Sequence, residues 1–131
     1  MTDMGELQYY VGVSVVQDKQ NNRLWLHQRR YINKIVVKFG QAEAKTVATP
    51  ADVNVKLIKE DGVSKLVDPT QYQSIIGSLL YLAVATRPDI AYAVGVLSKF
   101  CAKPSEAHLT AAKRVLRYLK GTENLGLELI V

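Results

Sequence analysis

Apolar residues follow two spacings along the chain: alternate positions near the N-terminus, and steps of three and four further on. Residues 10–16 and 24–26 are rich in β-branched and aromatic side chains, which favour strands. The polar residues 17–23 between them are typical of a turn. We therefore predict a β-hairpin over residues 6–27, in which Gly12 marks a bulge or a close backbone approach in the first strand.

Residues 28–39 show the spacing of a helix. Five apolar positions recur at steps of three and four: Tyr31, Ile32, Ile35, Val36 and Phe39. Gly40 stands where a glycine in a left-handed conformation ends a helix. Residues 41–68 have no clear period, so we predict an extended connector there, with a loop at residues 60–62 and its most mobile part at residues 53–66.

A second helix is predicted from Pro69 to about residue 85. Asp68 can cap it, and Gln71 completes a capping-box pattern. The segment Thr86-Arg87-Pro88-Asp89 breaks this helix, and we expect its role to be structural, including a contact between Arg87 and Asp89. The apolar face of the helix is wide and comprises Tyr72, Ile75, Ile76, Leu79, Leu80 and Ala83.

Two more helices and a strand complete the pattern. One helix begins near Pro88 and runs to about Phe100, and the last follows the N-cap Ser105 and ends at Gly121. Residues 125–131 alternate enough to form a strand. The predicted fold class is α+β, with an N-terminal β-hairpin, about four α-helices and a short C-terminal strand.

The composition fits one intracellular domain, or a piece of one. The chain has 131 residues, of which 48% are apolar, and a net charge of +5 that favours a polyanionic partner. Cys101 is the single cysteine, and we expect it to pack as a small apolar residue in a reducing compartment. The sequence has no signal peptide and no apolar run of about 18 residues, which predicts a cytoplasmic or nuclear protein with no membrane partner.

We predict no catalytic residues and no metal or cofactor site in this chain. His27 and His108 lie far apart in the sequence and lack partners at the spacing of zinc ligands. Glu60 and Asp61 are adjacent, so their side chains diverge, and we expect them to be solvated loop charges. Two-metal chemistry needs carboxylates that converge on both ions, and the sequence offers no such set.

Positive side chains recur on one face of the last helix and one face of the first. In the last helix the cations oppose an apolar stripe, an arrangement that can follow a phosphate backbone. The alternative is an ordinary solvated helix face. The residues predicted to bind nucleic acid are Lys113, Arg114, Arg117 and Lys120 in the last helix, and Arg30, Lys34 and Lys38 in the first.

Three aromatic residues lie in the predicted hairpin: Tyr9, Tyr10 and Trp25. They favour a small core between the sheet and the helices, because large aromatic side chains contribute strongly to cores. The other interpretation is stacking near a nucleic-acid strand. Both remain open at this point.

Several segments, in this order, resemble one known family. They are residues 4–13, Phe39-Gly40, Thr49-Pro50, residues 72–94 with the segment Thr86-Arg87-Pro88-Asp89, and residues 107–122. Together they resemble the C-terminal part of the reverse transcriptase in Ty1/copia-type retrotransposon Pol polyproteins. The resemblance covers nearly the whole chain.

This resemblance implies a fragment with four parts. Residues 1–40 would end the palm, residues 41–68 would be a connector, residues 69–122 would form thumb-like helices, and residues 123–131 would lead towards RNase H. The implied partners are an RNA/DNA or DNA duplex, which the fragment would bind and position, and the palm, fingers and RNase H portions of the polyprotein.

The resemblance also implies that the chain is not an enzyme by itself. The parent reaction is RNA-directed DNA synthesis with two Mg²⁺ ions. The carboxylates for polymerisation are expected before Met1, and those of RNase H after Val131. A decayed open reading frame and a co-opted domain remain alternatives. A different class of function is a helical protein-interaction or self-association module, which would use the apolar face of residues 72–83.

Overall fold

The chain folds into a four-stranded antiparallel sheet and four α-helices within the part that the structure describes. The computed structural model describes residues 4–10, 13–18, 20, 23–52, 57 and 65–130. The predicted α+β class is confirmed. The elements in chain order are β1 (Met4–Tyr10), β2 (Val13–Asp18), β3 (Arg23–His27), α1 (Arg29–Lys38), α2 (Pro69–Ala85), the 3-10 helix η1 (Pro88–Ile90), α3 (Ala91–Ser98), α4 (Glu106–Gly121) and β4 (Gly126–Ile130).

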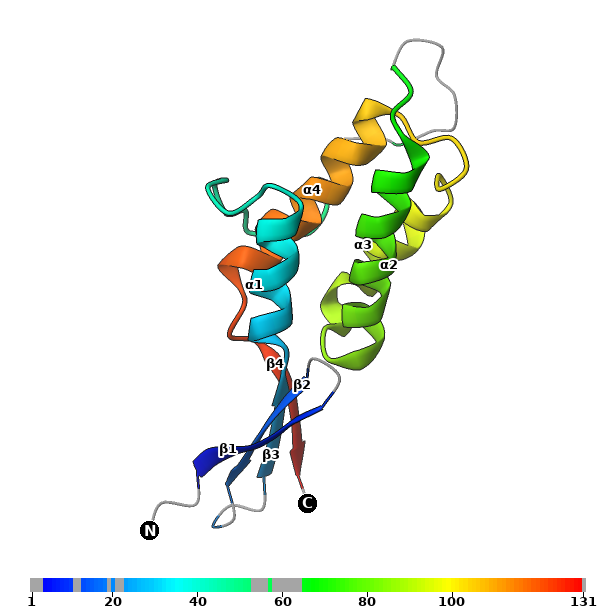
Figure 1. Cartoon of the computed structure of the whole chain (residues 1–131). Coiled ribbons are helices and arrows are strands. Elements are labelled where there is room, and N and C mark those ends of the chain that lie inside the picture. The colour runs from blue at the N-terminus through cyan, green and yellow to red at the C-terminus, as the bar shows by residue number, and fades with distance from the viewer. Residues whose placement is uncertain are drawn as a thin grey trace.

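The sheet has the strand order β1-β2-β3-β4 and extends from one end of the helices (Figure 1). The predicted C-terminal strand is confirmed as β4, and it pairs with β3 so that His27 lies opposite Gly126. In the sequence, all the described helices therefore come between β3 and β4, which are neighbours in the sheet.

One expectation about the N-terminal region is wrong. The first strand of the predicted hairpin is two strands, β1 and β2, which pair with Tyr10 opposite Val13. A run of β-formers reads the same as one long strand or two short ones, because alternation continues through both. Gly12, where we expected a bulge, lies outside the described residues. The pairing of β1 with β2 shifts between Glu6 and Gln8 instead.

The predicted end of α1 at Gly40 is confirmed. Gly40 has a φ of 75°, a conformation that glycine adopts without a steric cost. Its amide donates to the carbonyl of Val37 at 3.1 Å, and the amide of Gln41 donates to that of Val36 at 2.8 Å. These two bonds form a Schellman motif, which satisfies carbonyls at the end of the helix.

The other helices begin where their capping residues predict. Asp68 accepts a hydrogen bond of 3.0 Å from the amide of Thr70 at the start of α2. The amide of Ser105 donates to Nδ1 of His108 at 3.0 Å, so a histidine takes the place usually held by Glu or Gln in a capping box. α3 ends at Ser98, two residues before the predicted end near Phe100.

The core lies among the four helices. It takes up five of the six residues of the predicted apolar face of α2, whereas Leu80 is 41% exposed. Most of the apolar face of α2 is therefore buried in the core of the chain. Cys101 is partly buried against this core, as predicted, and burial raises the pKa of its thiol. The largest buried apolar residues are Ile32, Tyr72, Ile75, Ile76, Leu79, Leu82, Ile90, Leu116 and Leu119.

The connector is without helix or strand over residues 41–52, as predicted. Beyond it, Leu66 forms an isolated antiparallel bridge with Ser105. The predicted mobile segment and the loop at residues 60–62 fall almost entirely outside the described residues. Among the described helices, none combines the length and the apolar character needed to cross a membrane.

Candidate nucleic-acid interface

The connector covers the basic face of α4. Nζ of Lys120 donates to the carbonyls of Ala42 and Ala44 at 2.5 and 2.8 Å. Nε of Arg117 donates to the carbonyl of Lys45 at 2.7 Å. Farther along α4, Nη2 of Arg114 donates to the hydroxyl of Thr49 at 2.9 Å. The face is half-buried, in contrast to the open surface that the sequence predicted.

These cations hold neutral oxygens and have no carboxylate partner within the described part of the chain. Hydrogen bonds from a charged donor are stronger than those from a neutral one, but a carbonyl does not cancel the charge. Nε of Arg114 is buried and has no hydrogen-bond partner among the described residues. The described residues thus leave the positive charge of Arg114, Arg117 and Lys120 uncompensated, which favours anions near this surface.

The connector also approaches the end of α4 closely. A methyl group added at Gly121 would lie 2.9 Å from Cβ of Thr46, a distance that carbon atoms do not tolerate. Gly121 therefore lets the connector lie where the cations of α4 reach its carbonyls. The sequence predicted only that this glycine ends the helix.

The predicted cations of α1 are exposed. Arg30, Lys34 and Lys38 follow one another at steps of four residues, so they lie along one side of the helix. α1 contains no acidic residue. Nζ of Lys38 lies 5.3 Å from the ring centre of Phe39, within range of a cation–π contact. Because α1 packs against α4, the two predicted basic sets occur on neighbouring helices (Figure 1).

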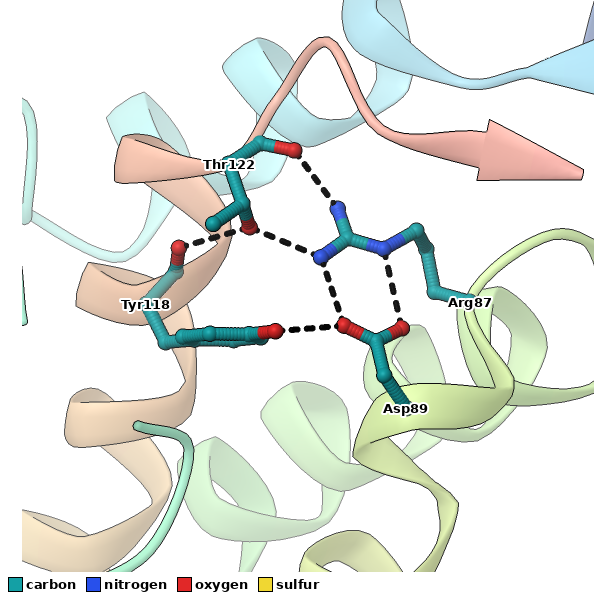
Figure 2. A network of polar contacts seen from close by, with 4 residues as sticks. All are labelled: Arg87, Asp89, Tyr118 and Thr122. Atoms are coloured by element: carbon teal, nitrogen blue, oxygen red, sulfur yellow. Dashed lines mark hydrogen bonds and ion pairs between the residues drawn. The ribbon is translucent and has the colours of Figure 1, made fainter. Parts of the chain in front are cut away.

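Arg87 forms the densest polar network in the described part of the chain (Figure 2). Its side chain is 1% exposed, and Nε and Nη2 donate to both carboxylate oxygens of Asp89 at 3.1 and 2.9 Å. Nη1 and Nη2 also donate to the carbonyl and the hydroxyl of Thr122 at 3.0 and 2.7 Å. The predicted contact between Arg87 and Asp89 is confirmed.

Tyr118 and Thr122 complete the network, and the sequence did not reveal them. The Tyr118 hydroxyl donates to Asp89 at 2.6 Å, and the Thr122 hydroxyl donates to the carbonyl of Tyr118 at 2.9 Å. Burial raises the pKa of Asp89, but the hydrogen bonds from Arg87 and Tyr118 outweigh it, so this pKa lies below its ordinary value. The hydrogen bond to Asp89, together with burial, raises the pKa of Tyr118.

The other candidates have structural roles or lie outside the described side chains. The His108 ring stacks on Phe100, with ring centres 3.9 Å apart, and caps α4. Within the described residues, no group of three or more His, Cys, Asp or Glu side chains could hold a metal ion. The side chains of Tyr9, Tyr10 and Trp25 lie outside the described part, so their role stays a prediction.

The chain is similar to segments of retrovirus-related Pol polyproteins from plant transposons. It is 47% identical over 125 residues to the retrovirus-related Pol polyprotein from transposon RE1 of Arabidopsis thaliana, matching 95% of this chain and 8% of that protein. It is 39% identical over 127 residues to that of transposon TNT 1-94 of Nicotiana tabacum, matching 93% of this chain and 10% of that protein. A third relative, from transposon RE2 of Arabidopsis thaliana, is 44% identical over 122 residues, with 93% of this chain and 8% of the relative covered.

The chain thus spans about a tenth or less of the length of these relatives. No family model and no solved structure matches it. The identities nevertheless extend across more than nine-tenths of the chain in all three relatives. The chain is therefore homologous, along nearly its whole length, to a segment of the retrovirus-related Pol polyproteins of transposons.

Proposed function

We propose that this chain is the C-terminal part of a Ty1/copia-type reverse transcriptase and that it binds and positions an RNA/DNA or DNA duplex. The observation that carries the proposal is the exposed row of cations on α1, formed by Arg30, Lys34 and Lys38. The homology to transposon Pol polyproteins supports it, because a duplex is the substrate that such a fragment would meet.

The geometry of the row suits a phosphate backbone. Four residues of helix rise about 6 Å, so the three cations spread over about 12 Å. A duplex carries one negative charge per roughly 1.7 Å of its axis, so each cation can reach a different phosphate. Such contacts fix the position of a duplex without reading its bases. The fragment would therefore bind many sequences about equally.

The cations of α4 are proposed to add to this surface. Arg117 commits only Nε to the connector, and its two Nη groups have no partner among the described residues. The connector thus holds the guanidinium while leaving donors for a phosphate. Lys113, Arg114 and Lys120 contribute positive charge beside it.

The test compares two triple variants with the same reduction in charge. Replacing Arg30, Lys34 and Lys38 with Gln removes the α1 row and keeps good helix formers. The control replaces Lys65, Lys99 and Lys103, exposed cations near the ends of α2, α3 and α4, with Gln. In the α1 variant only, the slope of log K against log salt for a mixed-sequence duplex should fall by about 0.9 for each phosphate that is no longer bound. Equal slopes in the two variants would contradict the proposal.

We also propose that this fragment does not catalyse polymerisation or RNA cleavage by itself. The carboxylates that hold Mg²⁺ would come from the palm and RNase H portions of the polyprotein, which, with the fingers, are its proposed protein partners. Primer extension with Mg²⁺ or Mn²⁺ tests this point separately from binding.

A second candidate function is self-association or binding of a protein partner. It is favoured by three exposed apolar side chains: Leu80 and Val84, one turn apart on α2, and Tyr92 on α3. Val84 is 87% exposed and Tyr92 83%. Sedimentation equilibrium tests this function, because apolar association persists at high salt, whereas association through nucleic acid does not. A chain that stays monomeric at all concentrations would rule out self-association.

A further inference from the structure

The sheet and the helices are joined by two crossings of the chain. At the first crossing β3 passes through Gln28 into α1, and at the second α4 passes through residues 122–125 into β4. Within the described chain, strands pack chiefly on strands and helices on helices. Figure 1 shows the sheet extending away from the helices. The direction of the sheet therefore depends on what holds the two crossings.

The first crossing is held by Thr86, the C-cap residue of α2. Its hydroxyl donates to Oε1 of Gln28 at 2.6 Å, and both side chains are buried. The carbonyl of Gln28 also accepts from the amide of Ile32 at 2.8 Å, so Gln28 starts α1. Nε2 of Gln28 is buried without a partner among the described residues, so without the Thr86 hydroxyl both polar ends of this amide would be unpaired. Because unpaired buried polar groups are costly, the bond favours this one arrangement over others.

The second crossing is held by the next residue, Arg87. Two of its nitrogens donate to the carbonyl and the hydroxyl of Thr122, where α4 leads into β4. Asp89 engages Nε and Nη2 of the guanidinium and so fixes the plane of the donors (Figure 2). The guanidinium is planar and is held by Asp89 on one side and Thr122 on the other. It therefore fixes the direction of Thr122 relative to Arg87 as well as the distance between them.

A third contact joins the two crossings to each other. Nη1 of Arg29, the first residue of α1, donates to Oδ1 of Asn124 in the second crossing at 3.2 Å. This contact is exposed and adds little stability. It shows that the two crossings lie side by side, within reach of the same turn after α2.

We infer that Thr86 and Arg87 are positioning residues that lock the sheet at a fixed angle to the helices. Two consecutive residues fasten the two crossings at once, so the end of α2 serves as a common anchor. Both residues are buried but polar, and neither belongs to the apolar core among the helices. The two anchored crossings would hold the sheet whether or not the chain binds nucleic acid.

Residual dipolar couplings of backbone amides in the full 131-residue chain test the lock. In the unmodified chain, couplings from β3 and β4 and from α1 and α4 should fit one alignment tensor. In Thr122→Val, and separately in Thr86→Val, the sheet should lose that common tensor while the helices keep theirs. Measuring the two variants separately preserves the test if one of them does not fold.

Matched variants separate positioning from general destabilisation. Thr122→Ser and Thr86→Ser keep the hydroxyls and should restore the common tensor. Val94→Ala removes buried methyl groups from α3 without touching either crossing, and it should lose stability yet keep the common tensor. A common tensor in both valine variants, separate tensors in the unmodified chain, or loss of the common tensor in Val94→Ala would overturn the inference.

Discussion

Tyr118 on α4 and Asp89 in η1 share a hydrogen bond of 2.6 Å that ties α4 to the turn after α2. Asp89 accepts from Arg87 and Tyr118 at once, and its pKa is lowered despite the opposing effect of burial. The ionised carboxylate of Asp89 therefore stabilises the fold by accepting these hydrogen bonds.

Acid should weaken the fold through Asp89. Because the folded pKa lies below the unfolded value of about 3.9, this group contributes stability above pH 4 that is lost as pH falls through the folded pKa. Asp89→Asn should flatten this part of the curve of unfolding free energy against pH. Urea titrations from about pH 2 to pH 6, in the range of these pKa values, measure the slope. An unchanged slope in the variant would assign the acid sensitivity to other carboxyl groups.

Removing Arg87 should be costly. Arg87→Met leaves the carboxylate of Asp89 and the carbonyl of Thr122 without their donors, and we expect a loss of about 3 kcal/mol in the free energy of unfolding. Arg117→Met is the control, since this half-buried cation donates to a single carbonyl. Its loss should be about 1 kcal/mol or less. Chemical denaturation gives both values, and equal losses would refute the special role of Arg87.

Two glycines should respond to alanine with opposite signs. Gly77→Ala, inside α2 with open space around it, should stabilise the chain by about 0.5 to 1 kcal/mol through helix propensity. Gly121→Ala should destabilise it by about 1 to 3 kcal/mol, because the new methyl group meets Thr46 at 2.9 Å. Thermal unfolding ranks the variants. Stabilisation by Gly121→Ala would mean that Thr46 and the connector move away from the new methyl group at no cost in stability.

The chain should not extend a primer. Template-directed synthesis requires carboxylates that converge on two metal ions, and within the described residues no group of three or more His, Cys, Asp or Glu side chains could hold a metal ion. Primer extension with Mg²⁺ or Mn²⁺ checks this. Extension by the purified chain that is abolished by replacing one of its own carboxylates would prove the expectation wrong.

The helices could be predicted because their signals are local. Asp68, Ser105 and Gly40 act on amides or carbonyls within three or four residues, so their effect is legible in the sequence. The strands β1 and β2 were harder, since one β-rich run hides the reversal between Tyr10 and Val13. A two-residue connection between strands is recognised from pairs such as Asn-Gly or Asp-Gly, and the Val11-Gly12 sequence between these two strands is not such a pair.

The sequence revealed only part of the candidate site, for a different reason. The sequence identifies the cations of α4, but their exposure depends on the path of a connector about 70 residues away in the chain, as the bond from Arg117 to Lys45 illustrates. The partner of Arg87 two residues away was predicted, whereas Thr122, thirty-five residues on, was not. Contacts between distant segments leave no periodic signature in a single sequence.

The pairing of His27 with Gly126 sets an order of events during folding. Joining β4 to β3 closes a loop of about 100 residues, which costs about 4 kcal/mol in chain entropy if the intervening segment is unstructured. Helices formed beforehand shorten that loop, because their packing already brings the two crossings together. We therefore expect β4 to join the sheet late, after α1 and α4 have packed, and amide exchange during refolding should show protection in the helices before it shows protection in β4.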